Sequence, residues 1–212
     1  MNELQMMVKF IVDGFVSPGS IYMWLILFIG FGILGLVGER AWFLFMKCGT
    51  STAAFMSSIS KYLKSGDFEK AIKFSSTVQT PLAKGILAVL QNRGKGSKQV
   101  AKAVDEVFLS EAPKIGRNIP LLPTLANLAT LLGLAGTIYG LMLAFDAIAN
   151  VPAAQRAQAL ATGISVAMST TLWGLVIAIP TILVHGFLAA RADRIMEEMD
   201  EKTAKLINLV EE

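Results

Sequence analysis

The sequence predicts an all-α integral membrane protein with three transmembrane helices, an N-terminus outside, a C-terminus inside and long cytoplasmic helical extensions. Hydrophobic residues make up 54% of the 212 residues and charged residues only 17%, whereas about 25% are charged in an ordinary soluble domain. Three stretches, residues 21–38, 118–145 and 157–190, contain no Asp, Glu, Lys or Arg. Because about 20 mostly apolar residues cross a bilayer, each stretch is long enough to span it.

The segments outside the spans are assigned from apolar spacing and turn signals. At the N-terminus, apolar residues recur at helical spacing until Ser17-Pro18-Gly19, which predicts an amphipathic helix on the membrane surface. Between the first two spans, Thr80-Pro81 is a helix start and Arg93-Gly94-Lys95-Gly96 is a turn. The predicted organisation is a periplasmic amphipathic helix (1–18), a first span (19–45), a cytoplasmic helical segment (46–117), a second span (118–148), a periplasmic loop (149–157), a third span (158–190) and a cytoplasmic C-terminal helix (191–212).

The predicted orientation depends on the distribution of Lys and Arg. Residues 46–117 hold twelve of these basic residues against five acidic ones, whereas the N-terminal arm holds only Lys9 and the loop after the second span only Arg156. Basic residues mark the cytoplasmic side of a membrane protein. The long segment is therefore predicted to be inside the cell and both shorter ones outside.

Several classes of function are excluded by what the sequence lacks. A nucleic-acid surface would need a clustered basic face with interleaved aromatic residues, which the sequence does not show. Cys48 is the single cysteine, so it predicts no internal disulfide, and we expect no metal site. An intramembrane protease would need paired catalytic residues inside the spans, but the chain has one histidine and no mid-span aspartate. We therefore expect no catalytic residues, no enzymatic activity, no cofactor and no nucleic-acid partner.

The second and third predicted spans each carry one stripe of small and hydroxylated residues. These are Thr130, Gly133, Thr137, Gly140 and Ala144, widened by Gly136, in the second span, and Gly163, Ala167, Thr170, Thr171, Gly174 and Ala178 in the third. Small residues let helix backbones approach closely in lipid, so we interpret the five glycines as packing residues. For the threonines two interpretations stay open, because a hydroxyl can bond back to its own helix or line an ion pathway.

Charged residues lie only at the ends of the predicted spans. Glu39 and Arg40 are at the cytoplasmic end of the first span, and we predict that they are structural charges. Adjacent helical positions do not face each other, so each is expected to pair elsewhere or to extend toward the membrane surface. No carboxylate lies at the centre of either striped span. If ions cross here, another chain must supply the titratable group that ion pathways normally contain.

Two stretches resemble the signature helices of the MotA/TolQ/ExbB family. They are LLPTLANLATLLGLAGTIYGLMLAF, residues 121–145, and GISVAMSTTLWGLVIAIP, residues 163–180. The most specific part is GLAGTIYG, which is similar to the family's Gly-Leu-x-Gly-Thr-Val-x-Gly core. Three spans rather than four suggest the ExbB/TolQ branch.

The resemblance implies a multi-pass protein of the bacterial cytoplasmic (inner) membrane that forms a homo-oligomer, a pentamer. Two copies of a single-span ExbD/TolR/MotB-like partner would lie inside the ring, and the aspartate of that partner would be the missing charge. Ion flow, of H⁺ or Na⁺, would then drive mechanical work across the cell envelope. The threonines that match the family's pore positions are Thr137 and Thr171, with Thr170 beside them.

Two departures from the family pattern bear on the ion. The glutamate usual in the third span of the ExbB/TolQ branch is replaced by Val166, and the usual proline before the glycine core is Thr130. The run VAMSTTLWG is instead similar to sodium-type motility stators, so sodium stays open beside the family's usual proton. The alternative function is a structural or scaffolding membrane protein that conducts nothing and uses the small-residue stripes only for packing. The sequence does not identify the load that such a motor would drive.

Overall fold

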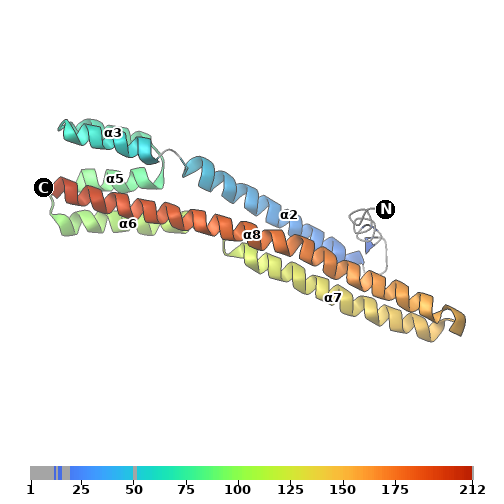
Figure 1. Ribbon diagram of the computed structural model, residues 1–212. Helices are drawn as coiled ribbons and strands as arrows, with labels where there is room; N and C mark the ends of the chain where they lie inside the picture. The colour runs from blue at the N-terminus through green and yellow to red at the C-terminus, as the bar shows by residue number, and fades with distance from the viewer. Residues whose placement is uncertain (1–11, 13, 16–19, 50–51, 212) are drawn as a thin grey trace. The chain divides into compact units, whose positions relative to one another are not determined.

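The computed structural model describes residue 12, residues 14–15, residues 20–49 and residues 52–211. Most of the predicted amphipathic helix, residues 1–18, lies outside this part of the chain. The described helices, ordered along the chain in Figure 1, are α2 (Ser20–Trp42), the π-helix η1 (Phe43–Lys47), α3 (Thr52–Lys64), α4 (Phe68–Thr77), α5 (Pro81–Asn92), α6 (Ser97–Ile115), α7 (Leu121–Asn150), the 3₁₀-helix η2 (Ala153–Gln155) and α8 (Arg156–Glu211).

The all-α fold class with three membrane-crossing helices is confirmed. All regular structure in the described residues is helical. Three helical stretches are long and apolar enough to cross a membrane, namely Ser20–Lys47, Leu121–Asn150 and part of Ala153–Asn208. The third span and the C-terminal segment belong to one helix, α8, which contains Pro180.

The chain divides into two units, which are described separately. The first, here called the apolar unit, comprises Met1–Val37 and Pro120–His185, and the second, the amphipathic unit, comprises Gly38–Ile119 and Gly186–Glu212. Helices α2 and α8 contribute to both units.

In the apolar unit, α2 packs on α8 through Gly30, and the ring of Phe15, which precedes α2, contacts one ring on each of the two helices. A Cβ atom added to Gly30 would lie 2.9 Å from Cδ1 of Ile177. The ring of Phe15 makes edge-to-face contacts with Trp24 at 5.3 Å and with Trp173 at 5.6 Å between ring centroids. Offset and edge-to-face arrangements are the favourable ones for aromatic pairs.

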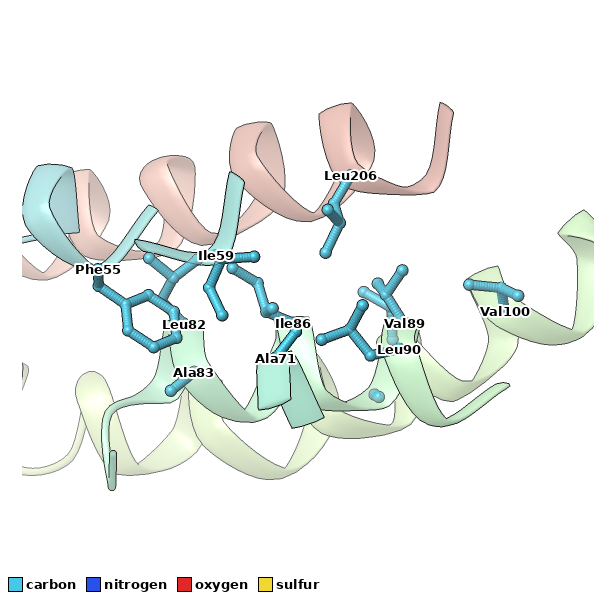
Figure 2. Packing of buried hydrophobic residues seen from close by; sticks show 12 residues of the cluster. Phe55, Ile59, Ala71, Leu82, Ala83, Ile86, Val89, Leu90, Val100 and Leu206 are labelled. Atoms are coloured by element: carbon cyan, nitrogen blue, oxygen red, sulfur yellow. The ribbon is translucent and has the colours of Figure 1, made fainter. Parts of the chain in front are cut away.

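The amphipathic unit surrounds an apolar cluster to which α3, α4, α5, α6 and the end of α8 all contribute. Ile59, Ala71, Ile86 and Val89 are fully buried in it, and Leu206 reaches it from α8. Figure 2 shows these side chains pointing toward one another from the separate helices. Burial of apolar side chains away from water is the main force that holds such a helical unit together.

The predicted helix start at Thr80-Pro81 is confirmed in detail, and a second capped helix start lies beside it. Helix α5 begins at Pro81, and the Thr80 hydroxyl oxygen accepts the backbone N–H of Ala83 at 3.3 Å. Helix α4 begins after Asp67, whose carboxylate accepts the N–H of Lys70 at 3.3 Å. Both side chains satisfy a backbone donor that the first turn of a helix leaves without an internal partner.

Candidate functional site: a hydroxyl cluster between two apolar helices

Helices α7 and α8 are close enough at the predicted glycines that no side chain would fit between them. A Cβ atom added to Gly140 would lie 2.9 Å from the Cα of Ala167, and one added to Gly136 would lie 2.7 Å from Cβ of Thr170. One added to Gly174 would lie 2.7 Å from the carbonyl oxygen of Ala129. The neighbouring atoms are mostly backbone, which cannot move aside.

The two other predicted packing glycines lie along the same contact. A Cβ on Gly133 would lie 3.1 Å from the carbonyl oxygen of Thr170, and one on Gly163 would overlap Ala144. All five predicted positions therefore face the partner helix within the apolar unit. Close backbone approach increases van der Waals contact between helices, which is what drives helix association in lipid.

Three threonine hydroxyls gather where the helices are closest. The Thr137 hydroxyl on α7 is hydrogen-bonded to the Thr171 hydroxyl on α8. It also lies 3.1 Å from the carbonyl oxygen of Gly133 and 3.2 Å from that of Ala167. The Thr171 hydroxyl lies 3.1 Å from the Gly133 carbonyl. The structure thus brings together the residues that sequence reasoning placed on separate spans.

The third hydroxyl, on Thr170, has a different environment. It donates to the Ala167 carbonyl at 2.8 Å and lies 3.3 Å from the Gly133 carbonyl. Thr170 is only 1% exposed, whereas Thr137 and Thr171 are half-buried in the isolated chain. Thr170 is therefore enclosed between the helices, and the Thr137–Thr171 pair lies at the edge of the contact.

The hydrogen-bond balance of the cluster determines its chemistry. Each hydroxyl has one proton to donate and two lone pairs that accept, and each of the two carbonyls offers one lone pair besides that used by its own helix. The three hydroxyl protons can thus be donated to the Gly133 carbonyl, the Ala167 carbonyl and a neighbouring hydroxyl. Acceptor lone pairs remain on Thr137 and Thr171, so the pair can accept a hydrogen bond from a protonated carboxyl group or can contact a cation.

No charged side chain lies near this cluster in the described part of the apolar unit. Its charged residues are Asp146, exposed near the end of α7, and Arg156, at the start of α8. Among the described residues, no group of three His, Cys, Asp or Glu side chains is placed to hold a metal ion. The described residues of the site therefore offer neutral oxygen atoms and no titratable group.

Val166 lines a groove of about 270 Å³ beside the cluster. The groove is bounded by small and apolar residues, which are Gly140, Leu143, Ala144, Ala147, Ala159, Thr162 and Gly163. Val166 is half-buried there. A side chain at this position thus faces open space between α7 and α8 rather than the packed contact.

Glu39 and Arg40 lie in the amphipathic unit, and their pairing differs from the expectation. The Arg40 guanidinium donates to the Glu39 carboxylate at 2.5 Å and to the backbone carbonyl of Lys114 at 3.2 Å. The expectation that adjacent residues would each pair elsewhere is therefore wrong for Glu39, because the long arginine side chain reaches back to its neighbour. Lys114 lies in the last turn of α6, where carbonyls have no helical partner, so the buried Arg40 caps that helix.

Sequence reasoning missed the two backbone carbonyls, of Gly133 and Ala167, that complete the hydroxyl cluster. One signal was available, because a threonine in a helix often donates to the carbonyl four residues earlier, and this places Gly133 beside Thr137. Reasoning from the sequence also gave no sign of the π-helix η1, which ends with the N–H of Cys48 bonded to the carbonyl of Phe43 at 3.1 Å.

Comparison with known proteins agrees with this architecture. Residues 75–201, more than half of the chain, match the MotA/TolQ/ExbB proton channel family. An ExbB-like biopolymer transport protein of Synechocystis sp. is 30% identical over 158 residues, which cover 73% of this chain and 75% of that protein. A biopolymer transport ExbB homologue of Methanothermobacter thermautotrophicus is 28% identical over 185 residues, or 86% of this chain.

A third relative comes from the TolQ side of the family. The Tol-Pal system protein TolQ of Pseudomonas aeruginosa is 32% identical over 97 residues, which cover 46% of this chain and 42% of that protein. The chain spans 63% of the length of the Methanothermobacter relative. The matched region contains α7, the hydroxyl cluster and most of α8. The chain belongs to the MotA/TolQ/ExbB proton channel family, in its ExbB/TolQ-like branch.

Proposed function

We propose that this chain is the ion-conducting subunit of an energy-transducing complex in the bacterial inner membrane. The observation that carries the proposal is the Thr137–Thr171 hydroxyl pair, which joins two apolar helices and keeps acceptor lone pairs at the edge of their contact. Because the described residues of the apolar unit supply no titratable group there, the proposal assigns that group to a partner chain. The activity is conduction and not enzymatic catalysis.

The partner in this proposal is an ExbD/TolR-like protein with one membrane helix that carries an aspartate. Five copies of the chain surround two copies of the partner, and the partner's aspartate passes the Thr137–Thr171 pairs. When protonated, the aspartate donates a hydrogen bond to a threonine hydroxyl, and this lowers the cost of holding a neutral carboxyl group in lipid. Proton flow then drives mechanical work on the envelope.

The orientation proposed with this function places the N-terminus outside and the amphipathic unit in the cytoplasm. It is supported by the twelve Lys and Arg residues between the first two spans. The conducted ion is proposed to be the proton, in agreement with the family that the chain matches. Sodium conduction is the outcome of the test below that would change this assignment.

The experiment measures ion flux through liposomes that contain the chain together with an aspartate-bearing single-span protein from the neighbouring reading frame. We expect proton flux with the partner, and a loss of at least tenfold in Thr137→Val and Thr171→Val, because valine has almost the shape of threonine but no hydroxyl. Flux is recorded with sodium present and with sodium replaced by a non-transported cation.

The matched control is Thr181→Val. Thr181 is also a buried hydroxyl of α8, but it donates to the Ile177 carbonyl of its own helix at 2.6 Å. We expect flux in this variant to equal that of the wild type. Flux that is unchanged in Thr137→Val and Thr171→Val would contradict the proposed pathway. Flux that occurs only when sodium is present would show that the conducted ion is sodium and not the proton.

The competing function is a scaffold that conducts nothing. One observation favours it, because the Thr170 hydroxyl and its carbonyl acceptors form a fully enclosed set that packing alone explains. A complex of chain and partner that assembles stably but passes neither ion would establish this alternative.

A further inference from the structure

We propose that one end of the amphipathic unit is a docking site for an acidic protein segment that carries a single apolar anchor residue. The site is formed by the turn between α3 and α4 and the turn between α5 and α6. We call it the cationic end and define it by six residues, Lys61, Lys64, Arg93, Lys95, Lys98 and Lys102. The proposal goes beyond ion conduction and does not depend on it.

Contacts inside the unit bring the two turns together. The Arg93 guanidinium lies 3.6 Å from the ring centroid of Phe68, the first residue of α4. The α3–α4 turn is closed by a hydrogen bond of 3.0 Å from the Asp67 N–H to the Tyr62 carbonyl. The last turn of α3, the first turns of α6 and the α5–α6 turn therefore share one end of the unit.

The charge at this end is not neutralised within the described part of the chain. All six cationic side chains are exposed, and none has an ion pair with a described residue. Asp67, the acidic residue of the α3–α4 turn, is paired with Lys70 at 2.5 Å. Gathered like charges repel one another and destabilise the compact state, so an acidic partner would be bound favourably here.

A groove of about 400 Å³ lies next to these charges. It is lined by Val89, Arg93, Gly94, Gly96, Ser97, Val100 and Ile207. Val89 and Val100, which are buried and visible in Figure 2, give it an apolar wall. A Cβ atom added to Gly94 or Gly96 would meet nothing within 4 Å, so the opposite rim is open to an approaching backbone.

The combination of an apolar wall and a cationic rim distinguishes among partners. Binding of single-stranded nucleic acid depends on exposed aromatic faces for stacking, but Arg93 covers the ring of Phe68. Binding to a membrane surface depends on exposed apolar side chains that insert. The exposed large apolar residues described in this unit lie in α2, η1, the middle of α6 and the part of α8 that follows His185, away from the two turns, and are Trp42, Phe45, Met46, Leu109 and Phe187. An acidic peptide with one apolar anchor fits both features.

The test uses the full chain in detergent and two fluorescent peptides, Glu-Glu-Leu-Glu-Glu-Asp and the same peptide with serine in place of leucine. We expect the leucine peptide to bind at least fivefold more tightly, and binding of both peptides to weaken as salt rises. The variant Lys95→Glu/Lys98→Glu should bind at least tenfold more weakly. The control Lys73→Glu changes an exposed cation of α4 outside the defined set and should bind like the wild type.

A second variant tests the groove separately from the charge. Ser97→Trp fills the groove from its exposed rim and leaves every cation in place, so the preference for leucine should disappear while the serine peptide still binds. Equal binding of the two peptides to the wild type, or unchanged binding to Lys95→Glu/Lys98→Glu, would overturn the proposal. So would tighter binding of a 12-nucleotide polyuridine or of phosphatidylglycerol vesicles. Ion flux in Lys95→Glu/Lys98→Glu should equal that of the wild type. Peptide binding and ion conduction are therefore tested independently of each other.

Discussion

The two units hold their helices together by different physical means. In the apolar unit, α7 and α8 are so close that a Cβ on Gly140 would lie 2.9 Å from the Cα of Ala167, and hydroxyls bond to carbonyls across the contact. In the amphipathic unit, large side chains such as Ile86 fill the space between helices, and a buried carboxylate, Glu111, joins α6 to α5. Lipid is as apolar as leucine, so burial of leucine does not drive helices together there, whereas in water it does.

The largest loss of stability is expected from a substitution that places a bulky side chain between α7 and α8. Gly140→Leu would force a branched side chain into the backbone of α8. Overpacking typically costs about 1–3 kcal/mol, and we expect the upper end of this range because backbone atoms cannot move aside. We expect separation of α7 from α8 and loss of the proposed oligomer. The measurements are the native mass of the purified assembly and its thermal midpoint.

The control for this change is Gly32→Leu. Gly32 lies in α2, and a Cβ there would meet nothing within 4 Å. Its thermal midpoint should stay near that of the wild-type chain. A Gly140→Leu protein with the wild-type native mass and midpoint would show that the close approach of α7 and α8 is dispensable.

The amphipathic unit should respond instead to loss of a charge. Glu111 is 5% exposed and accepts hydrogen bonds from Lys84 at 3.0 Å and from Lys114 at 2.7 Å. Burial alone would raise the pKa of Glu111, but the hydrogen bonds from Lys114 and Lys84 outweigh it and hold the pKa below its ordinary value. Glu111→Gln should therefore destabilise α5 and α6 by about 1–2 kcal/mol at pH 7, less than for a fully buried pair because both lysines are partly exposed.

The pH dependence of this loss follows from the direction of the shift. Because the pKa is lower in the folded state than the value of about 4.3 in the unfolded chain, the stabilisation is complete above that value and disappears as the pH falls through the folded pKa. Urea titrations at pH 7 and pH 3 can be monitored by hydrogen exchange of peptides from α5 and α6. The difference in free energy of unfolding between the wild type and Glu111→Gln should be smaller at pH 3 than at pH 7. Asp105→Asn, which changes an exposed acid of the same helix, should show little difference at either pH. A Glu111→Gln difference of equal size at both pH values would contradict this account.

The contrast between the units also explains which features could be predicted from the sequence. Long uncharged stretches and the spacing of Gly133, Gly136 and Gly140 are local patterns, so the spans and the packing stripe could be identified without coordinates. The sequence could not predict that Thr170 is enclosed while Thr171 lies at the edge of the contact. Adjacent residues of a helix differ by a rotation of about 100°, and only the position of α7 relative to α8 decides which of the two is enclosed. The Arg40 cap on the Lys114 carbonyl has no sequence signal, since every residue has a carbonyl and only the end of α6 leaves this one available.

The smallest effect on stability, and the most informative, is expected from Thr171→Val. Hydrogen bonds between membrane helices contribute on average about 0.6 kcal/mol, and valine keeps the shape of the packed side chain. Urea or thermal unfolding of the purified chain should therefore give a free energy of unfolding within about 1 kcal/mol of the wild-type value. The control Thr181→Val should give the same result. If a variant this stable has also lost its ion flux, the hydroxyl acts on the ion and not on the packing. A Thr171→Val chain that loses several kcal/mol would instead assign the hydroxyl pair to structure, and α7 and α8 would then be held by hydrogen bonds as much as by their glycines.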